Sequence, residues 1–133
     1  STQSRSSAAS DVYKRQGENM ANTFKVKTKE SVNNSSLDTI YTVPSSTSTV
    51  VLGLALCNKT TSAITADVQL VSDTSDTETN ANIFLLKAVS IPGSSTLEVF
   101  GGQKIVIQTT DVIKAQASTG SALDVALSIM EIT

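Results

Sequence analysis

The sequence predicts an all-β domain: a single antiparallel β-sandwich, immunoglobulin-like or jelly-roll-like, with about seven to eight strands. Short apolar segments recur about every ten residues with turn residues between them, and no long window has the 3.6-residue period of a helix. Ser and Thr supply 38 of the 133 residues, and these small hydroxyl residues suit the outward faces of strands. A parallel α/β fold would need crossover connections of a dozen or more residues, for which the chain has no room.

The stretch from Thr49 to Asn58 is predicted to be the central strand. At a period of two, one face carries Val50, Leu52, Leu54 and Leu56, and the other carries Val51, Gly53, Ala55 and Cys57. Both faces are apolar, which indicates a strand covered on both sides. The single cysteine, Cys57, is therefore expected to be a buried free thiol.

The remaining strands are placed where apolar residues alternate between turn segments. They are expected at Thr39–Val43, Ile64–Leu70, Ile83–Val89, Leu97–Phe100, Ile105–Ile107, Ile113–Ala117 and Leu123–Met130. In the last of these, Leu123, Val125, Leu127 and Ile129 share the face that we expect to be buried. The segment from Asp111 to Ser118 would also tolerate a helix, because it contains Ala and Lys.

The chain divides into three parts. Residues 1–19 are predicted to be disordered and non-native: they begin with a Ser-rich run, and Asp11–Gln16 resembles the translation of a sequencing adaptor. A natural disordered arm is the alternative. Residues 20–36 are expected to form an N-terminal arm or an edge strand, and residues 37–133 the β-sandwich domain. Within the arm, Lys25, Lys27 and Lys29 share one side, which favours a solvated face over a phosphate-binding patch.

The composition argues against catalysis. The chain has no histidine and no tryptophan, which excludes Ser-His-Asp and Cys-His nucleophilic systems and histidine metal sites. Most acidic residues stand singly at turns or outward positions, where we expect solvated surface: Asp38, Asp67, Glu98, Asp111 and Asp124. We therefore expect neither an enzyme nor a cofactor.

One acidic cluster is a weak candidate for a metal site. Asp73, Asp76 and Glu78 offer three carboxylates within six residues, and carboxylate oxygens are ligands for Ca²⁺. Their spacing does not match the calcium loop of EF-hands, and no glycine is present for its sharp turn. A soluble loop tip is the preferred interpretation.

Charge and hydropathy limit the classes of partner that we expect. The formal net charge is −2 and the sequence pI is about 5.0, so nucleic acid is not an expected partner. The longest apolar run, Val50 to Cys57, is far shorter than the roughly 20 residues that span a bilayer. Nothing in the sequence resembles a secretory signal peptide, and no membrane contact is expected.

Several segments resemble a family of small virion structural proteins of tailed phages, especially marine ones. The similarity runs from Met20 to the C-terminus and is carried by Met20–Lys25, Tyr41–Pro44, Val51–Leu54 with Asn58, Ile91–Ser95, Asp111–Lys114 and Leu127–Thr133. Members of that family often have Gly immediately before the position of Asp111, where this chain has Thr110. This difference calls into question whether the turn keeps a left-handed backbone.

The resemblance implies a non-enzymatic component of a virion, assembled in the host cytoplasm. Its expected role is capsid decoration or cement, or a neck or tail accessory, with other virion proteins as partners. We predict a homo-oligomer, such as a trimer, in which Met20 to Ser36 contacts a neighbour. The alternative is a carbohydrate- or receptor-binding module of a phage tail, which would need exposed aromatic residues or a calcium-fixed loop. Tyr41 is the best aromatic candidate, and it is expected to face inward.

Overall fold

A computed structural model describes residues 22–72, 80–100 and 103–133 of the chain. This part of the chain contains nine strands and no helix, and the strands form two antiparallel sheets. The strands are β1 (Asn22–Lys29), β2 (Asp38–Thr42), β3 (Ser48–Asn58), β4 (Ile64–Val71), β5 (Ile83–Ile91), β6 (Thr96–Glu98), β7 (Ile105–Ile107), β8 (Val112–Ala117) and β9 (Leu123–Ile132). The predicted all-β sandwich is confirmed, and the segment that would have tolerated a helix is strand β8.

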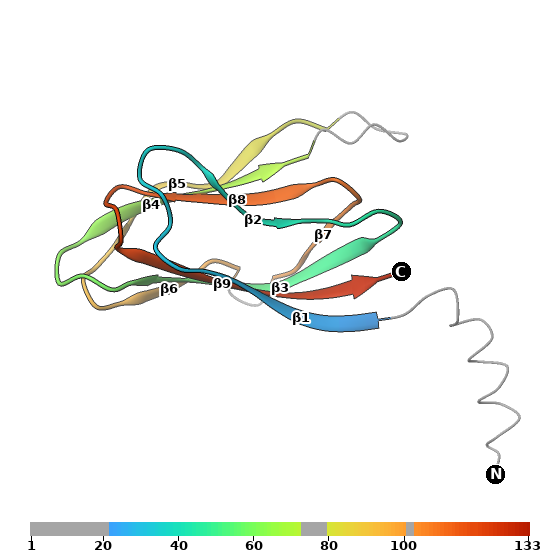
Figure 1. The fold of residues 1–133 in the computed structure, drawn as a ribbon, viewed down its shortest axis with the longest axis horizontal. Helices are drawn as coiled ribbons and strands as arrows, with labels where there is room; N and C mark the ends of the chain where they lie inside the picture. Colours follow the sequence, from blue (N-terminus) through green and yellow to red (C-terminus); the bar gives the residue numbers. More distant parts are fainter. Residues whose placement is uncertain (1–21, 73–79, 101–102) are drawn as a thin grey trace, which may run out of the picture.

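The two sheets lie one above the other in Figure 1. Sheet A has the order β1-β9-β3-β6, with β7 also pairing with β3, and sheet B has the order β2-β8-β4-β5. The pairs are nested along the chain: β1 pairs with β9, β2 with β8, β3 with β6 and β7, and β4 with β5. A long hairpin that is rolled up into two sheets in this way is a jelly roll.

Strands β6 and β7 are two pieces of the same sheet edge. Strand β6 pairs with Ala55–Cys57 of β3, and β7 pairs with Thr49–Val51 of the same strand, both antiparallel. Counted as one interrupted strand, they reduce the nine strands to the eight of a jelly roll. Between the two predicted types of sandwich, the strand order therefore selects the jelly roll.

The core fills the space between the two sheets. The largest fully buried side chains are Leu56, Ile91, Ile107, Ile113, Leu123, Leu127, Ile129, Val32, Val43, Val51, Val68 and Asn58. The predicted inward face of the last strand is confirmed, because Leu123, Val125, Leu127 and Ile129 of β9 are all buried. Aliphatic side chains dominate this core, and Tyr41 is its buried aromatic residue among the described part of the chain.

The predicted alternation along the central strand is wrong at one point. The pairing of β3 with β9 shifts register between Val51 and Gly53, which leaves Leu52 as an extra residue in a β-bulge. The bulge reverses which face each later residue takes: Thr49 and Val51 are buried before it, and Leu54 and Leu56 after it. Val50 and Leu52 consequently do not share a buried face with Leu54 and Leu56.

The environment of Cys57 also differs from the expectation. Its thiol is free, as predicted, but the residue is only half-buried. Cys57 pairs with Asp124 of β9 on the outer face of sheet A. The residue is therefore a surface position on a sheet face and not part of the core.

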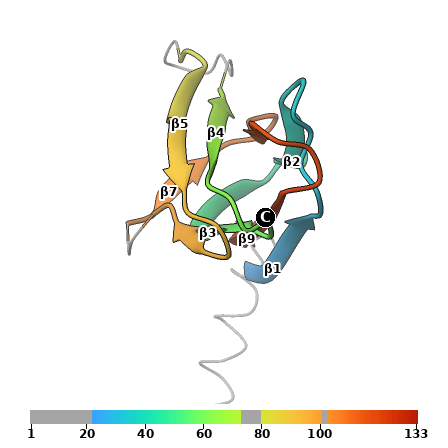
Figure 2. The ribbon, with the colours of Figure 1, turned by 90° about the vertical axis from the view of Figure 1, so that its left-hand side faces the viewer.

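The start of the described chain is an edge strand of sheet A. Strand β1 pairs antiparallel with β9 along its whole length, from Asn22 opposite Ile132 to Lys29 opposite Val125. Because Lys25 and Lys27 lie opposite the buried Ile129 and Leu127, the lysines take the inward side of the sheet, whereas Phe24 and Val26 take the outward side. Figure 2 shows β1 at the margin of the sandwich, at the opposite side from β5.

Candidate interaction surface

The sequence-predicted metal loop cannot be placed. Asp73, Asp76 and Glu78 lie outside the described residues. Among residues 22–72, 80–100 and 103–133, no three His, Cys, Asp or Glu side chains gather in a way that could hold a metal ion. The same ranges contain no helix of the length and apolar character that a membrane crossing requires.

The expectation of solvated surface is wrong for Asp111, which is buried, whereas Asp38, Asp67 and Asp124 are partly exposed; all four have structural partners. Each accepts a hydrogen bond from a backbone amide: Asn33 to Asp38 (2.7 Å), Ala88 to Asp67 (2.6 Å), Gln108 to Asp111 (2.9 Å) and Ser31 to Asp124 (3.0 Å). Carboxylates in this role fix loops and bulges. Asp111 is buried as well, whereas Glu98 is exposed on β6.

A buried polar cluster closes the sandwich between β1 and β2. The Tyr41 hydroxyl donates to Glu131 Oε2 at 2.6 Å and lies 2.9 Å from the Thr49 hydroxyl. Lys25 Nζ contacts the other carboxylate oxygen of Glu131 at 2.8 Å, and Lys27 Nζ lies 6.0 Å from the centroid of the Tyr41 ring. Lys25 is exposed, as a solvated face requires, but its ammonium also neutralises a buried carboxylate.

The pKa values in this cluster are shifted in opposite directions. Burial of the phenol, together with its hydrogen bond to Glu131, raises the pKa of Tyr41 to about 12. The Lys25 ammonium and the Tyr41 hydroxyl hold the pKa of Glu131 below its usual value. Both shifts favour one fixed protonation pattern, a neutral phenol beside a carboxylate, which suits a structural cluster better than an acid–base pair that must exchange protons. As predicted, Tyr41 faces inward and is not a stacking surface.

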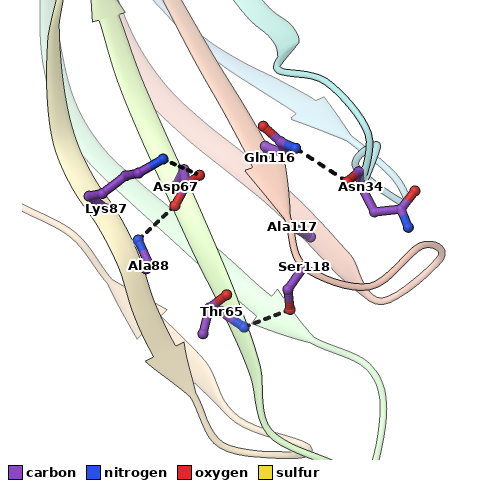
Figure 3. Close-up of a pocket in the computed structure, with 8 residues that line it drawn as sticks. All are labelled: Asn34, Thr65, Asp67, Lys87, Ala88, Gln116, Ala117 and Ser118. Carbon is purple, nitrogen blue, oxygen red and sulfur yellow. Dashed lines mark hydrogen bonds and ion pairs between the residues drawn. The ribbon is translucent and has the colours of Figure 1, made fainter.

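A small polar pocket lies on the outer face of sheet B. It has a volume of about 210 Å³ and draws its lining from β4, β5, β8 and the loop that carries Asn34. Figure 3 shows its polar groups largely satisfied by one another. Asp67 binds the Ala88 amide and Lys87, the Thr65 amide donates to Ser118 Oγ at 2.9 Å, and Gln116 Nε2 donates to the Asn34 carbonyl at 3.2 Å.

The chemistry available in this pocket is hydrogen bonding. Ala88 has a left-handed backbone (φ 52°), and this bulged conformation aims its amide at Asp67 in place of the usual sheet ladder. Phe84, which is 44% exposed, is the nearest aromatic residue on β5, and Lys87 Nζ lies 4.6 Å from its ring centroid. A neutral polar ligand is the class that such a pocket could hold.

The outer face of sheet A carries apolar side chains across four strands, exposed on β1 and β7 and half-buried on β9 and β3. Phe24 of β1 lies opposite Met130 of β9, Met130 lies opposite Val50 of β3, and Val50 lies opposite Val106 of β7. We call these four residues the ridge. Phe24 is 71% exposed and Val106 66% exposed. Val26, one step along β1 on the same face, is 61% exposed.

The same face is hollowed beside the ridge. Small side chains follow further along the strands, with Thr28 of β1 opposite Ala126 of β9, and Ala126 opposite Ala55 of β3. These three residues and Cys57 line a hollow of about 280 Å³, which we call the small-residue hollow; its lining also includes Lys29, Glu30, Asp124 and Val125. Contiguous exposed apolar residues on a sheet face mark an interaction site more often than scattered ones do.

The fold and these surfaces define the chain as a jelly-roll domain with an apolar outer face on sheet A. No protein-family model matches the chain, and no curated protein matches it in sequence. Among solved structures, the chain is similar to a protein of the viral particle of infectious bursal disease virus, with a TM-score of 0.51 and 9% identity, over 84% of this chain and 31% of that one. The chain thus corresponds to less than a third of the length of that protein.

Two further solved structures are similar to the chain with lower TM-scores. A capsid protein of a Helicobacter pylori bacteriophage gives a TM-score of 0.46 with 13% identity over 86% of this chain and 93% of that one. A protein of Bacillus endospore appendages gives 0.44 with 10% identity, over 85% and 86%. At these identities the similarity concerns the fold alone.

Proposed function

We propose that the chain is a non-enzymatic structural protein of a virion, which acts through protein–protein contacts as a capsid decoration or cement protein or as a neck or tail accessory. The observation that carries this proposal is the ridge on the outer face of sheet A. A folded domain gains nothing by leaving Phe24 and Val106 in water, so their exposure is explained by a partner that covers them.

Four further observations support the proposal. The sequence resembles virion structural proteins of tailed phages along the segments quoted above, and jelly rolls occur in viral capsid and lectin domains. The chain has no histidine, and its buried Tyr41–Glu131 pair is held in one protonation pattern. A structural role requires neither a reactive group nor a cofactor.

Purified particles of the phage that carries this gene provide the test. Mass spectrometry of density-banded particles should detect peptides of the chain in a fixed ratio to the major capsid protein, and immunogold labelling should place it on the shell, neck or tail. Particles that contain no such peptides, while the protein is abundant in the infected cell, would contradict the proposal. The site of gold labelling decides between a capsid and a tail role.

A second candidate function is glycan or receptor binding by a phage tail. It is favoured by the polar pocket on sheet B beside the exposed Phe84, since sugar-binding sites combine hydrogen-bonding groups with an aromatic face. Glycan-array binding that is lost in a Gln116→Ala, Asp67→Asn double variant and retained in a Phe24→Ser variant would support this function. Retention of binding in the double variant would count against the pocket.

A further inference from the structure

We propose that the outer face of sheet A binds a second copy of this chain, face to face, with the ridge of each copy lying over the small-residue hollow of the other. The proposal deepens the proposed function and rests on it only for the biological setting. The pair is symmetric, because the ridge and the hollow lie on the same face at matching positions.

The match follows from the register of the strands. The Gly53–Ser128 pair lies at the centre of the face, next to Val26 of β1. On one side of this row, two residues away along each strand, the ridge crosses β1, β9 and β3 at Phe24, Met130 and Val50. On β3 the offset is three residues in the sequence, because the bulge adds one residue. The hollow crosses the same strands two residues to the other side, at Thr28, Ala126 and Ala55.

Consider a two-fold axis that lies between the two facing sheets, perpendicular to the strands and above this central row. It places the ridge of each copy over the hollow of the other. It places Phe24 of one copy over Thr28 of the other, and Val50 of one copy over Ala55 of the other. Val26 then lies against its own symmetry mate. An interface of this kind is isologous, so the bulky side chains of each copy fill the space that small side chains leave in its mate.

The size and charge of the face suit such a pair. The three long strands, about 4.8 Å apart over some eight residues, together with the 3-residue strands β6 and β7, give a projected area of roughly 470 Å². Exposed side chains make the accessible area larger, which brings it near the about 800 Å² per partner of a standard interface. The central three rows, from the ridge to the hollow, carry no charged side chain on β1, β9 or β3. On the fourth strand, Glu98 of β6 lies beside Ala55 in the row of the hollow, and the axis sets it against Val106 of the mate and not against a like charge. At Gly53 a Cβ would meet nothing within 4 Å, which leaves room for close approach.

The free edge of sheet A is a poorer contact for a second copy. Antiparallel pairing of two β1 strands would set lysines on one side of the joint strand pair, because Lys25, Lys27 and Lys29 share one side of β1. Like charges on directly opposite strands are destabilising, and edge lysines are a common defence against such pairing. The face is therefore the favoured route to a dimer.

The first test compares two exposed phenylalanines. In sedimentation equilibrium the wild-type chain should dimerise, Phe24→Ser should weaken dimerisation at least tenfold, and Phe84→Ser on sheet B should leave it unchanged. Both residues are exposed, so neither change should unfold the protein, and the thermal midpoint of each variant verifies this. A wild-type chain that stays monomeric to hundreds of micromolar, or equal effects of the two variants, would overturn the proposal.

The second test measures the orientation. Ser48 and Cys57 lie at opposite ends of β3 on the outer face, paired with Ile132 and Asp124 respectively. The proposed axis brings residue 48 of one copy over Cys57 of the other, although within one chain they are about 30 Å apart. A Ser48→Cys variant treated with a bifunctional thiol reagent that spans the roughly 10 Å between packed sheets should give covalent dimers well above the wild-type level. Equal cross-linking of variant and wild type would overturn this arrangement, and detection of the protein in particles would still stand as support for the proposed function.

Discussion

The Tyr41 hydroxyl lies 2.6 Å from Glu131 Oε2 and joins the two sheets through a buried hydrogen bond. Tyr41 belongs to β2 of sheet B, and Glu131 to β9 of sheet A. Lys25 supplies the charge that the carboxylate needs, from the edge strand β1. The cluster thus ties the first described strand, the last strand and the opposite sheet together at one margin of the sandwich.

The raised pKa of Tyr41 predicts a loss of stability at alkaline pH. Between pH 10 and about 12 the unfolded chain ionises this phenol while the folded chain does not, so the contribution is present below pH 10 and is lost as the pH rises through about 12. Urea unfolding across this range should show a decline on the order of 2 kcal/mol. The decline should be smaller in Tyr41→Phe, and an identical decline in both proteins would contradict the assignment.

The lowered pKa of Glu131 predicts a loss of stability at acidic pH. A depressed carboxyl pKa stabilises the fold above the unfolded value of about 4.3, and this contribution is lost as the pH falls through the folded pKa. Glu131→Gln should therefore be less stable than the wild type at pH 7, by about 1–3 kcal/mol, and the two stabilities should converge toward pH 3. Parallel pH profiles from urea unfolding would be inconsistent with this role.

Asn58 is predicted to be the polar residue on which one end of the sandwich depends. It is fully buried, and its amide donates to the carbonyls of Ser62, Ile91 and Pro92 while its oxygen accepts from Thr60. Asn58→Ala leaves these groups unpaired and should cost about 3 kcal/mol in free energy of unfolding. Asn34→Ala, at an exposed position, is the matched control and should change it by no more than about 0.5 kcal/mol.

The alternation of apolar residues allowed the fold class and the inward face of β9 to be predicted, because a strand with one buried face must repeat every two residues. The bulge at Leu52 could not be predicted, since all residues from Val50 to Ala55 are apolar or small and no change of pattern marks it. Cys57 was misplaced for the same reason. The Tyr41–Glu131 contact joins residues 90 positions apart, and only the strand order brings them together.

The turn before β8 has a left-handed backbone at a residue that is not glycine. Thr110 has φ 74°, so the turn has the left-handed geometry that its threonine called into question. A β-branched residue there is strained by about 1–3 kcal/mol, and Thr110→Gly should raise the free energy of unfolding by about 1 kcal/mol after the entropic cost of glycine. Thr28→Gly in the extended strand β1 should lower it, and a destabilising Thr110→Gly would show that the strain is absent.

Hydroxyl-radical footprinting tests most directly whether the outer face of sheet A is the contact surface. Oxidation rates of Phe24 and Met130 would be measured in dilute protein, in concentrated protein and in purified particles, with the exposed Phe84 as internal reference. Phe24 and Met130 should become protected in concentrated protein and in particles, while Phe84 should stay reactive. Equal reactivity of Phe24 under all three conditions would contradict this expectation.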